Sequence, residues 1–106
     1  MDIGSLKKES DLSFDVAVAK RNALEKAHSR LVVVYHEHIF RADAETINLV
    51  KTLEEVHSSP FYILDTNNNP MEVSNSKELL HVLVERNQEA MSSYHQMSKT
   101  FEKRND

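Results

Sequence analysis

The chain has 106 residues, a formal net charge of −4 and no cysteine. This length predicts one domain, and the lack of cysteine excludes disulfides and cysteine nucleophiles and fits a reducing, cytoplasmic location. The negative charge disfavours broad binding to phosphate backbones, and no apolar run approaches the ~20 residues that a membrane-spanning helix needs. Only one glycine and two prolines interrupt the chain, which favours long helices.

The first predicted element is a long helix over residues 13–58, preceded by a mobile arm over residues 1–12 that has no sustained apolar period. From Phe14 to Val56, apolar side chains recur at intervals of three and four, and no glycine or proline interrupts them. Arg21 occupies the one step that is otherwise missing from this stripe. The early stripe consists of Phe14, Ala17, Leu24, His28 and Leu31.

A second interpretation is open for residues 31–40, where β-branched and aromatic side chains alternate with others as in a β-strand. In that case the first helix ends near Arg30, and Asp43 caps a second helix over residues 44–58. A strand also places His36 and His38 on one side, as some metal sites need. We favour the continuous or kinked helix, because no helix-breaking residue lies in this stretch.

A β-hairpin is predicted over residues 61–73. Proline at position 60 ends the first helix, since the residue before a proline is disfavoured in the α conformation. Two short apolar runs then flank the polar segment 65–70, whose aspartate, asparagine and proline residues are typical of turns.

The last predicted element is a helix over residues 76–103. Asn75 and Glu78 have the spacing of a helix start, in which the asparagine accepts from the backbone and the glutamate reaches back. We call the apolar line along this helix its seam. The seam consists of Leu80, Val84, Asn87, Met91, Tyr94, Ser98 and Phe101. A polar Asn87 at such a position fixes register when it finds a polar partner.

Together these elements predict a mainly α fold, a long coiled-coil-like helical hairpin with a short β-hairpin between its two long helices. The ordered part forms one helical domain over residues 13–104. This order resembles the layout of prefoldin-type chaperone subunits, which implies a chaperone-like role in assembly. The antiparallel last helix covers only the later part of the first, so we expect the stretch from Phe14 to His28 to need another chain.

Metal binding is an alternative that rests on a repeated spacing. The pattern Glu-x-x-His occurs three times, at Glu25 and His28, Glu54 and His57, and Glu78 and His81. Glutamate and histidine three residues apart share one helix face, as in di-iron helix bundles. The second and third pairs flank the hairpin, so Glu54, His57, Glu78 and His81 are the candidate ligands of a divalent metal. A metal-dependent oxidase is the one enzymatic activity that this pattern allows, and solvated charges beside the seam are the competing interpretation.

A second alternative is an accessory role with nucleic acid. Lys20, Arg21, Lys26 and Arg30 cluster near the end of the early stripe and could contact phosphates. The overall negative charge makes this a minority interpretation.

The function that we expect is non-enzymatic: an adaptor, scaffold component or small chaperone that binds itself, as a homo-oligomer, or another protein. The sequence contains no glycine-rich phosphate loop and no GxSxG nucleophile motif. The predicted interface combines the two apolar lines and consists of Phe14, Ala17, Leu24, His28, Leu31, Asn87, Met91, Tyr94 and Phe101.

Overall fold

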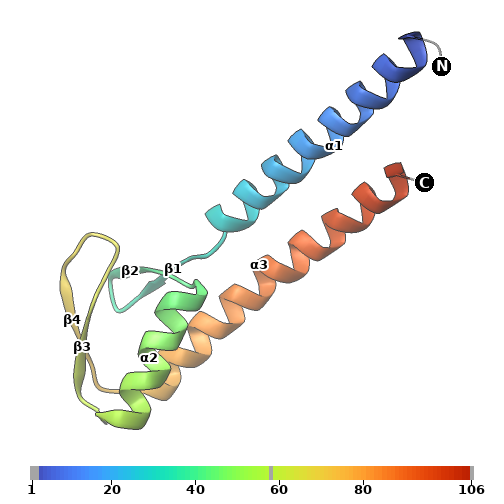
Figure 1. Cartoon of the computed structure of the whole chain (residues 1–106). Helices are drawn as coiled ribbons and strands as arrows, with labels where there is room; N and C mark the ends of the chain where they lie inside the picture. The colour runs from blue at the N-terminus through green and yellow to red at the C-terminus, as the bar shows by residue number, and fades with distance from the viewer. Residues whose placement is uncertain (1–2, 58, 106) are drawn as a thin grey trace.

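The computed structural model describes the backbone of residues 3–57 and 59–105, and the side chains of residues 14–57 and 59–101. Within these ranges, three helices alternate with two β-hairpins (Figure 1). In chain order the elements are α1 (Ile3–Ser29), β1 (Val32–Tyr35), β2 (His38–Arg41), α2 (Ala44–Val56), β3 (Phe61–Leu64), β4 (Pro70–Val73) and α3 (Ser76–Asn105). The mainly helical class is confirmed. No helix in the described part of the chain is long and apolar enough to cross a membrane.

The predicted continuous helix over residues 13–58 is wrong, and the strand interpretation of residues 31–40 is correct. α1 ends at Ser29, and the chain then forms the antiparallel hairpin β1–β2. This hairpin pairs Val32 with Arg41, Val33 with Phe40, Val34 with Ile39 and Tyr35 with His38. Exposed and buried residues alternate along β1, so burial of one strand face outweighs the helical spacing.

The turn between β1 and β2 consists of His36 and Glu37, whose φ angles are 48° and 68°. A two-residue hairpin turn requires positive φ at both central positions to match the twist of the strands. This conformation costs residues other than glycine about 1–2 kcal/mol each. The cost is offset by strand pairing and by core burial on both sides of the turn.

The helix starts agree with the caps read from the sequence. Asp43 has an extended backbone before α2, and its Oδ1 accepts a hydrogen bond from the Thr46 amide at 2.9 Å. Asn75 Oδ1 accepts from the Glu78 amide at 3.2 Å, while Asn75 Nδ2 donates to Glu78 Oε2 at 3.2 Å. At the other end of the chain, α1 begins at Ile3, so the predicted arm over residues 1–12 is helical from there on.

The predicted hairpin over residues 61–73 and the predicted helix over residues 76–103 are confirmed as β3–β4 and α3. The α3 seam is displaced by one residue, however. Leu83 is fully buried at 0 % exposed, whereas the predicted seam residue Val84 is 40 % exposed. The face of α3 that packs against the core is therefore rotated relative to the predicted one.

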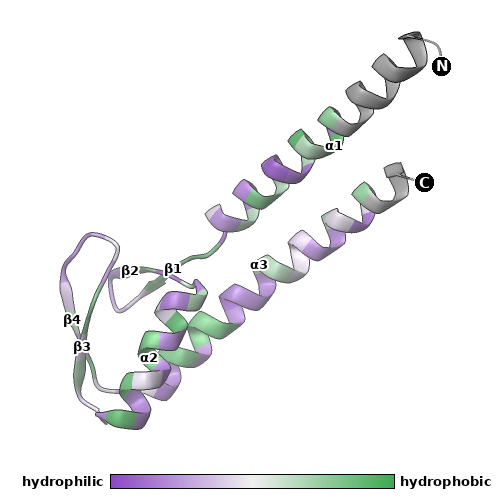
Figure 2. Ribbon diagram, in the orientation of Figure 1, coloured by the Kyte–Doolittle hydropathy of each residue, from purple (hydrophilic) through white to green (hydrophobic). Residues whose placement is uncertain are grey.

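The core lies in a head that both hairpins, α2 and the first part of α3 build together. Figure 2 shows hydrophobic residues of α2 and α3 meeting in this region. The largest fully buried side chains come from four different elements and are Phe40, Val50, Val73, Leu79 and Leu83. The Thr66 amide donates to the Ile39 carbonyl at 2.9 Å, so the second hairpin is also tied to the first.

α1 and the later part of α3 form an antiparallel two-helix arm that projects from the head (Figure 1). The whole molecule measures 67 × 23 × 22 Å. Ala23 and Ala27 of α1 and Ala90 of α3 are buried, and these small side chains let the helices approach closely. The prediction that the stretch from Phe14 to His28 has no intrachain partner is therefore wrong, because α3 covers one face of it.

Candidate functional site

The four candidate metal ligands lie where α2 ends and α3 begins. Glu54 and His57 belong to the last turn and cap of α2, and Glu78 and His81 to the first turns of α3. His81 Nε2 lies 3.2 Å from Glu85 Oε1, which is a neighbour on the same helix. Among the residues that the structure describes, no three histidine, aspartate or glutamate side chains converge as metal ligands.

Glu78 contacts three side chains that belong to the fold itself. Its Oε2 accepts from the Asn75 amide group in the helix cap, and its Oε1 lies 3.9 Å from Nε2 of His36. Glu78 also interacts with the Tyr35 hydroxyl. Burial raises the pKa of Tyr35, and the charge and hydrogen bond of Glu78 act in the same direction. This carboxylate therefore lies between the tip of the β1–β2 hairpin and the start of α3.

The two histidines of the His-x-His element serve different partners. The His36 ring stacks on Tyr35, with ring centroids 4.1 Å apart. His38 Nδ1 instead donates to Oδ2 of Asp65 at 2.7 Å. The element thus connects the first hairpin to α3 on one side and to the second hairpin on the other.

The His38–Asp65 pair is the most buried ionisable contact among the described residues, with 26 % and 4 % of the two side chains exposed. Oδ1 of Asp65 accepts from the backbone amides of Asn67 and Asn69, each at 2.9 Å. The hydrogen bond from Asn69, with those from His38 and Asn67, holds the pKa of the Asp65 carboxyl below its ordinary value of 3.8 against the effect of burial. Sequence reasoning missed Asp65, although aspartate at the start of a polar turn is typical of such backbone bonding.

The lowered pKa predicts how stability depends on pH. Because the folded protein protonates Asp65 at a lower pH than the unfolded chain, this residue contributes stability above pH 3.8 that is lost as the pH falls through the folded pKa. We expect Asp65→Asn to lower the free energy of unfolding at neutral pH and to flatten its decline in acid. Urea unfolding at a series of pH values measures both, and an identical acid slope in the two proteins would contradict the assignment.

The predicted interface residues fall into two groups. Leu31 is buried within the chain, and Asn87 Nδ2 donates to the Ala42 carbonyl at 3.0 Å, so these two already have intrachain roles. Phe14 and Leu24 are 68 % and 39 % exposed. The remaining five are exposed or half-buried on the arm, and they are Ala17, His28, Met91, Tyr94 and Phe101.

The arm has few covering elements. α2 begins beside Asn87 and runs away from the arm along α3, so beyond that point α1 and α3 lie only against each other (Figure 1). Among the described residues from Met91 to Phe101, none is fully buried, although Tyr94 and Met97 are large and only half-exposed. Two helices therefore leave part of their apolar surface uncovered along the arm.

The two sides of the arm can be distinguished by helix geometry. The helices face each other along a line through Val16, Ala23 and Ala27 of α1 and Ala90 and Met97 of α3, all buried or half-buried. Each following residue is rotated by about 100° about the helix axis. Because the helices are antiparallel, residues that follow these contact positions lie on the same side of the pair, and residues that precede them lie on the other.

These two sides differ sharply in chemistry. The side after the contact positions, which we call the open side, carries Ala17, Leu24, His28, Met91 and Ser98. The side before them, which we call the polar side, carries Asp15, Asn22, Lys26, Glu89 and Gln96. The open side therefore presents Leu24 and Met91 without a carboxylate, whereas the five polar-side residues are charged or carry amides, and the half-buried Val18 and Ala19 are the apolar residues of α1 nearest to them.

The open side ends at a hollow where the arm meets the head. This hollow has a volume of about 240 Å³ and is lined by His28, Leu31, Arg41 and Asp43. A larger hollow of about 540 Å³ lies on α3 and is lined by polar residues of that helix alone. The first hollow combines the apolar side chain of Leu31 with charged groups, and it continues the open side through His28.

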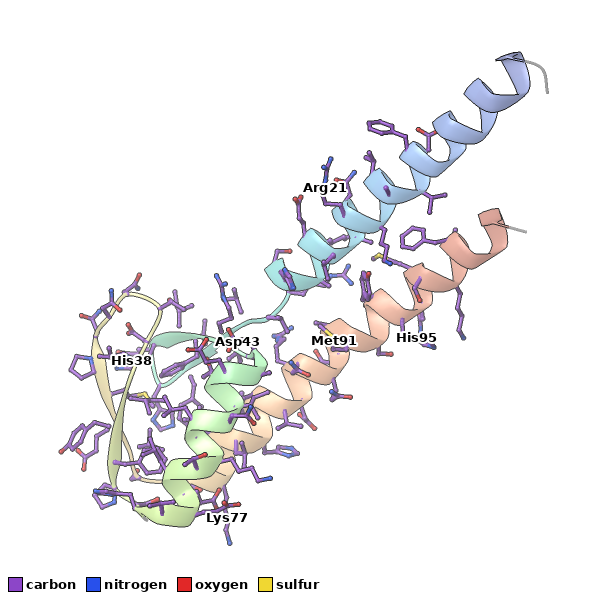
Figure 3. All side chains as sticks on the ribbon, viewed as in Figure 1. Arg21, His38, Asp43, Lys77, Met91 and His95 are labelled. Carbon is purple, nitrogen blue, oxygen red and sulfur yellow. The ribbon has the colours of Figure 1, made fainter. Side chains whose placement is uncertain are left out.

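The predicted basic cluster does not form one face. Lys26 belongs to the polar side, and Arg30 donates from Nη1 to the Ser93 hydroxyl across the arm. Lys20 and Arg21 are exposed beside the open side. Figure 3 shows Arg21 pointing away from α3. The four residues therefore do not present a continuous surface for phosphates.

Comparison with known proteins finds no match among protein-family models, curated proteins or solved structures. A proposal for the function therefore has to rest on the geometry of the arm and the head.

Proposed function

We propose that this protein is a non-enzymatic interaction or assembly protein that binds another polypeptide along the open side of its helical arm. The observation that carries the proposal is the contrast between the two sides of the arm. The five residues of the polar side, Asp15, Asn22, Lys26, Glu89 and Gln96, are charged or carry amides, as expected for a helix face in water. The open side keeps Leu24 and Met91 where a third helix would cover them.

The size of the arm suits such a contact. Residues 14–29 of α1 span about 24 Å at 1.5 Å per residue, and two helices of about 10 Å diameter lie side by side. The resulting face of about 24 by 20 Å is somewhat more than half of the about 800 Å² per partner that a standard interface buries. Covering the exposed parts of Leu24 and Met91 contributes on the order of 1 kcal/mol each.

The ionisable groups of the head support a structural role rather than catalysis. Among the described residues, the two groups with shifted pKa values are Tyr35 and Asp65, and both contact residues of another element of the fold. Among the described residues, no serine or threonine hydroxyl is hydrogen-bonded to His38 beside Asp65. The pair therefore lacks the nucleophile that a histidine–aspartate arrangement activates in hydrolases.

Paired substitutions on the two sides of the arm test the proposal. Leu24→Asp with Met91→Asp places two carboxylates on the open side, and Asn22→Asp with Gln96→Glu adds the same charge to the polar side. The native mass of each protein in extracts of the cells that produce it is the measurement. We expect the wild type and the polar-side variant in a complex heavier than the 12.2 kDa chain.

The open-side variant is expected to lose at least about 90 % of that complex, because burying an unpaired carboxylate in an apolar contact costs more than about 1.4 kcal/mol. Circular dichroism establishes that each variant is folded. The proposal is wrong if all three proteins run at the mass of the single chain, or if the two double variants lose the complex equally.

A further inference from the structure

Arg21 is a charged residue that lies beside the middle of the open side. Arg21 lies four residues after Ala17 and three before Leu24, so it interrupts the apolar stripe. It is exposed and points away from α3 (Figure 3). Among the described residues, no carboxylate forms an ion pair with Arg21. Lys20 beside it is exposed as well, so the charged groups along this side are both basic.

A polypeptide that covers Leu24 also covers Arg21. The guanidinium remains charged at any physiological pH, and covering it without an opposite charge opposes binding. A carboxylate facing Arg21 reverses this effect, because it accepts two parallel hydrogen bonds from the planar guanidinium. Arg21 therefore favours partners that place a carboxylate opposite it over partners that do not.

A second copy of this chain does not supply that carboxylate. The open side of any copy carries no aspartate or glutamate among its described residues, and the positions farther out are Gln88 and His95 on α3 and Glu25 on α1. Glu25 lies two residues after Ala23, about 200° around the helix, so it is on the face of α1 opposite α3. Figure 3 shows His95 on the side of α3 away from α1. Two copies packed along their open sides would therefore bring Arg21 and Lys20 near the same uncharged or basic residues.

We infer that the partner is an amphipathic helix of another protein, whose apolar stripe is flanked or interrupted by a carboxylate that pairs with Arg21. This inference rests on the proposed function and specifies the chemistry of the partner. In the head, α2 packs along the first part of α3, from its start to the level of Asn87. The partner helix takes the corresponding place along the arm, with its end near the hollow lined by His28 and Arg41.

Two synthetic helical peptides of 21 residues test the inference. Both carry leucine at heptad spacing, and they differ only at one central position beside the stripe, which is glutamate in one and lysine in the other. Fluorescence anisotropy measures their binding to the full-length protein at low and high salt. We expect the glutamate peptide to bind about tenfold more tightly than the lysine peptide, with a smaller ratio at high salt.

A charge swap provides the decisive comparison. Arg21→Glu is expected to reverse the preference, so that the lysine peptide binds more tightly. The matched control Lys26→Glu makes the same charge change on the polar side and is expected to leave the preference unchanged. A preference that Lys26→Glu alters as much as Arg21→Glu would show a general charge effect and overturn the inference.

Other outcomes separate the inference from the proposed function. Equal binding of both peptides, abolished by Leu24→Asp, would refute the charge rule and leave the open side as a binding surface. Self-association in sedimentation, abolished by Leu24→Asp, would make the partner a second copy and again refute only the inference. A chain that stays monomeric and binds neither peptide would contradict both.

Discussion

Leu83→Ala is expected to lower the free energy of unfolding by about 2–5 kcal/mol, the range for removing a fully buried leucine side chain. Leu83 is 0 % exposed and packs in the core between α3, α2 and the hairpins. The neighbouring Val84, which the sequence placed in the seam, is 40 % exposed. Val84→Ala is expected to cost less than about 1 kcal/mol, as for other partly exposed positions.

Urea unfolding of these two variants and the wild type measures the difference. Because the residues are adjacent on one helix, helix propensity and local sequence are closely matched between them. A larger loss for Val84→Ala than for Leu83→Ala would show that the seam predicted from the sequence is the one that packs, and the rotation of α3 described above would be wrong.

Phe40→Ala is expected to have the largest effect of any single substitution in β2, about 3–5 kcal/mol. Phe40 is 1 % exposed and lies opposite Val33 in the hairpin, with its ring against the core. Ile39 precedes it on the strand and is 38 % exposed on the outer face. Ile39→Ala is therefore expected to cost markedly less, although it also removes a large apolar side chain.

This comparison tests the strand itself. In a strand, neighbouring residues point to opposite faces, so the two substitutions must differ. Chemical unfolding provides the two free energies, and amide hydrogen exchange reports whether the Ile39 region remains protected. A larger loss for Ile39→Ala than for Phe40→Ala would argue for the helical interpretation of residues 31–40 and against the β1–β2 hairpin, because the helical spacing buries Ile39 instead.

The signals that predicted the fold correctly are local. The polar turn formers of segment 65–70 fix the second hairpin, and the reciprocal cap of Asn75 and Glu78 fixes the start of α3. Asp43 fixes the start of α2 in the same way. Each of these depends on residues within a few positions of one another, and such interactions can be predicted without knowing what packs against them.

The first hairpin lacks a comparable local signal. Two-residue turns of this kind usually contain asparagine or glycine, whereas here His36 and Glu37 adopt the left-handed conformation. The apolar residues from Leu31 to Phe40 satisfy both a helical and a strand period, so the sequence leaves the choice to tertiary packing. Burial of Val33 and Phe40 on the head decides it.

The displaced seam of α3 has a similar cause. Leu79 and Leu80 are adjacent, and so are Leu83 and Val84, so two seams one residue apart fit the spacing equally well. On α1, the contact with α3 uses Ala23 and Ala27, which a search for large apolar residues passes over. Small residues at a helix contact could therefore have indicated the partner of α1.

Four of the interface residues expected from the sequence lie together on the open side, namely Ala17, Leu24, His28 and Met91. Their role in binding stays a prediction. Leu31 and Asn87 are not free to contact a partner, because Leu31 is buried within the chain and Asn87 donates a hydrogen bond to the Ala42 carbonyl. The His38–Asp65 pair joins residues 27 positions apart and could not be predicted while residues 31–40 were assigned to a helix.

The most direct test of the open side as a binding surface uses the absence of native cysteine. Leu24→Cys and Asn22→Cys place a single thiol on the open side and the polar side at the same level of α1. Maleimide labelling is compared between the purified chain and the protein in intact cells. We predict that the thiol at position 24 is protected only in cells while the one at position 22 reacts in both, and equal labelling of the two positions in cells would contradict the account.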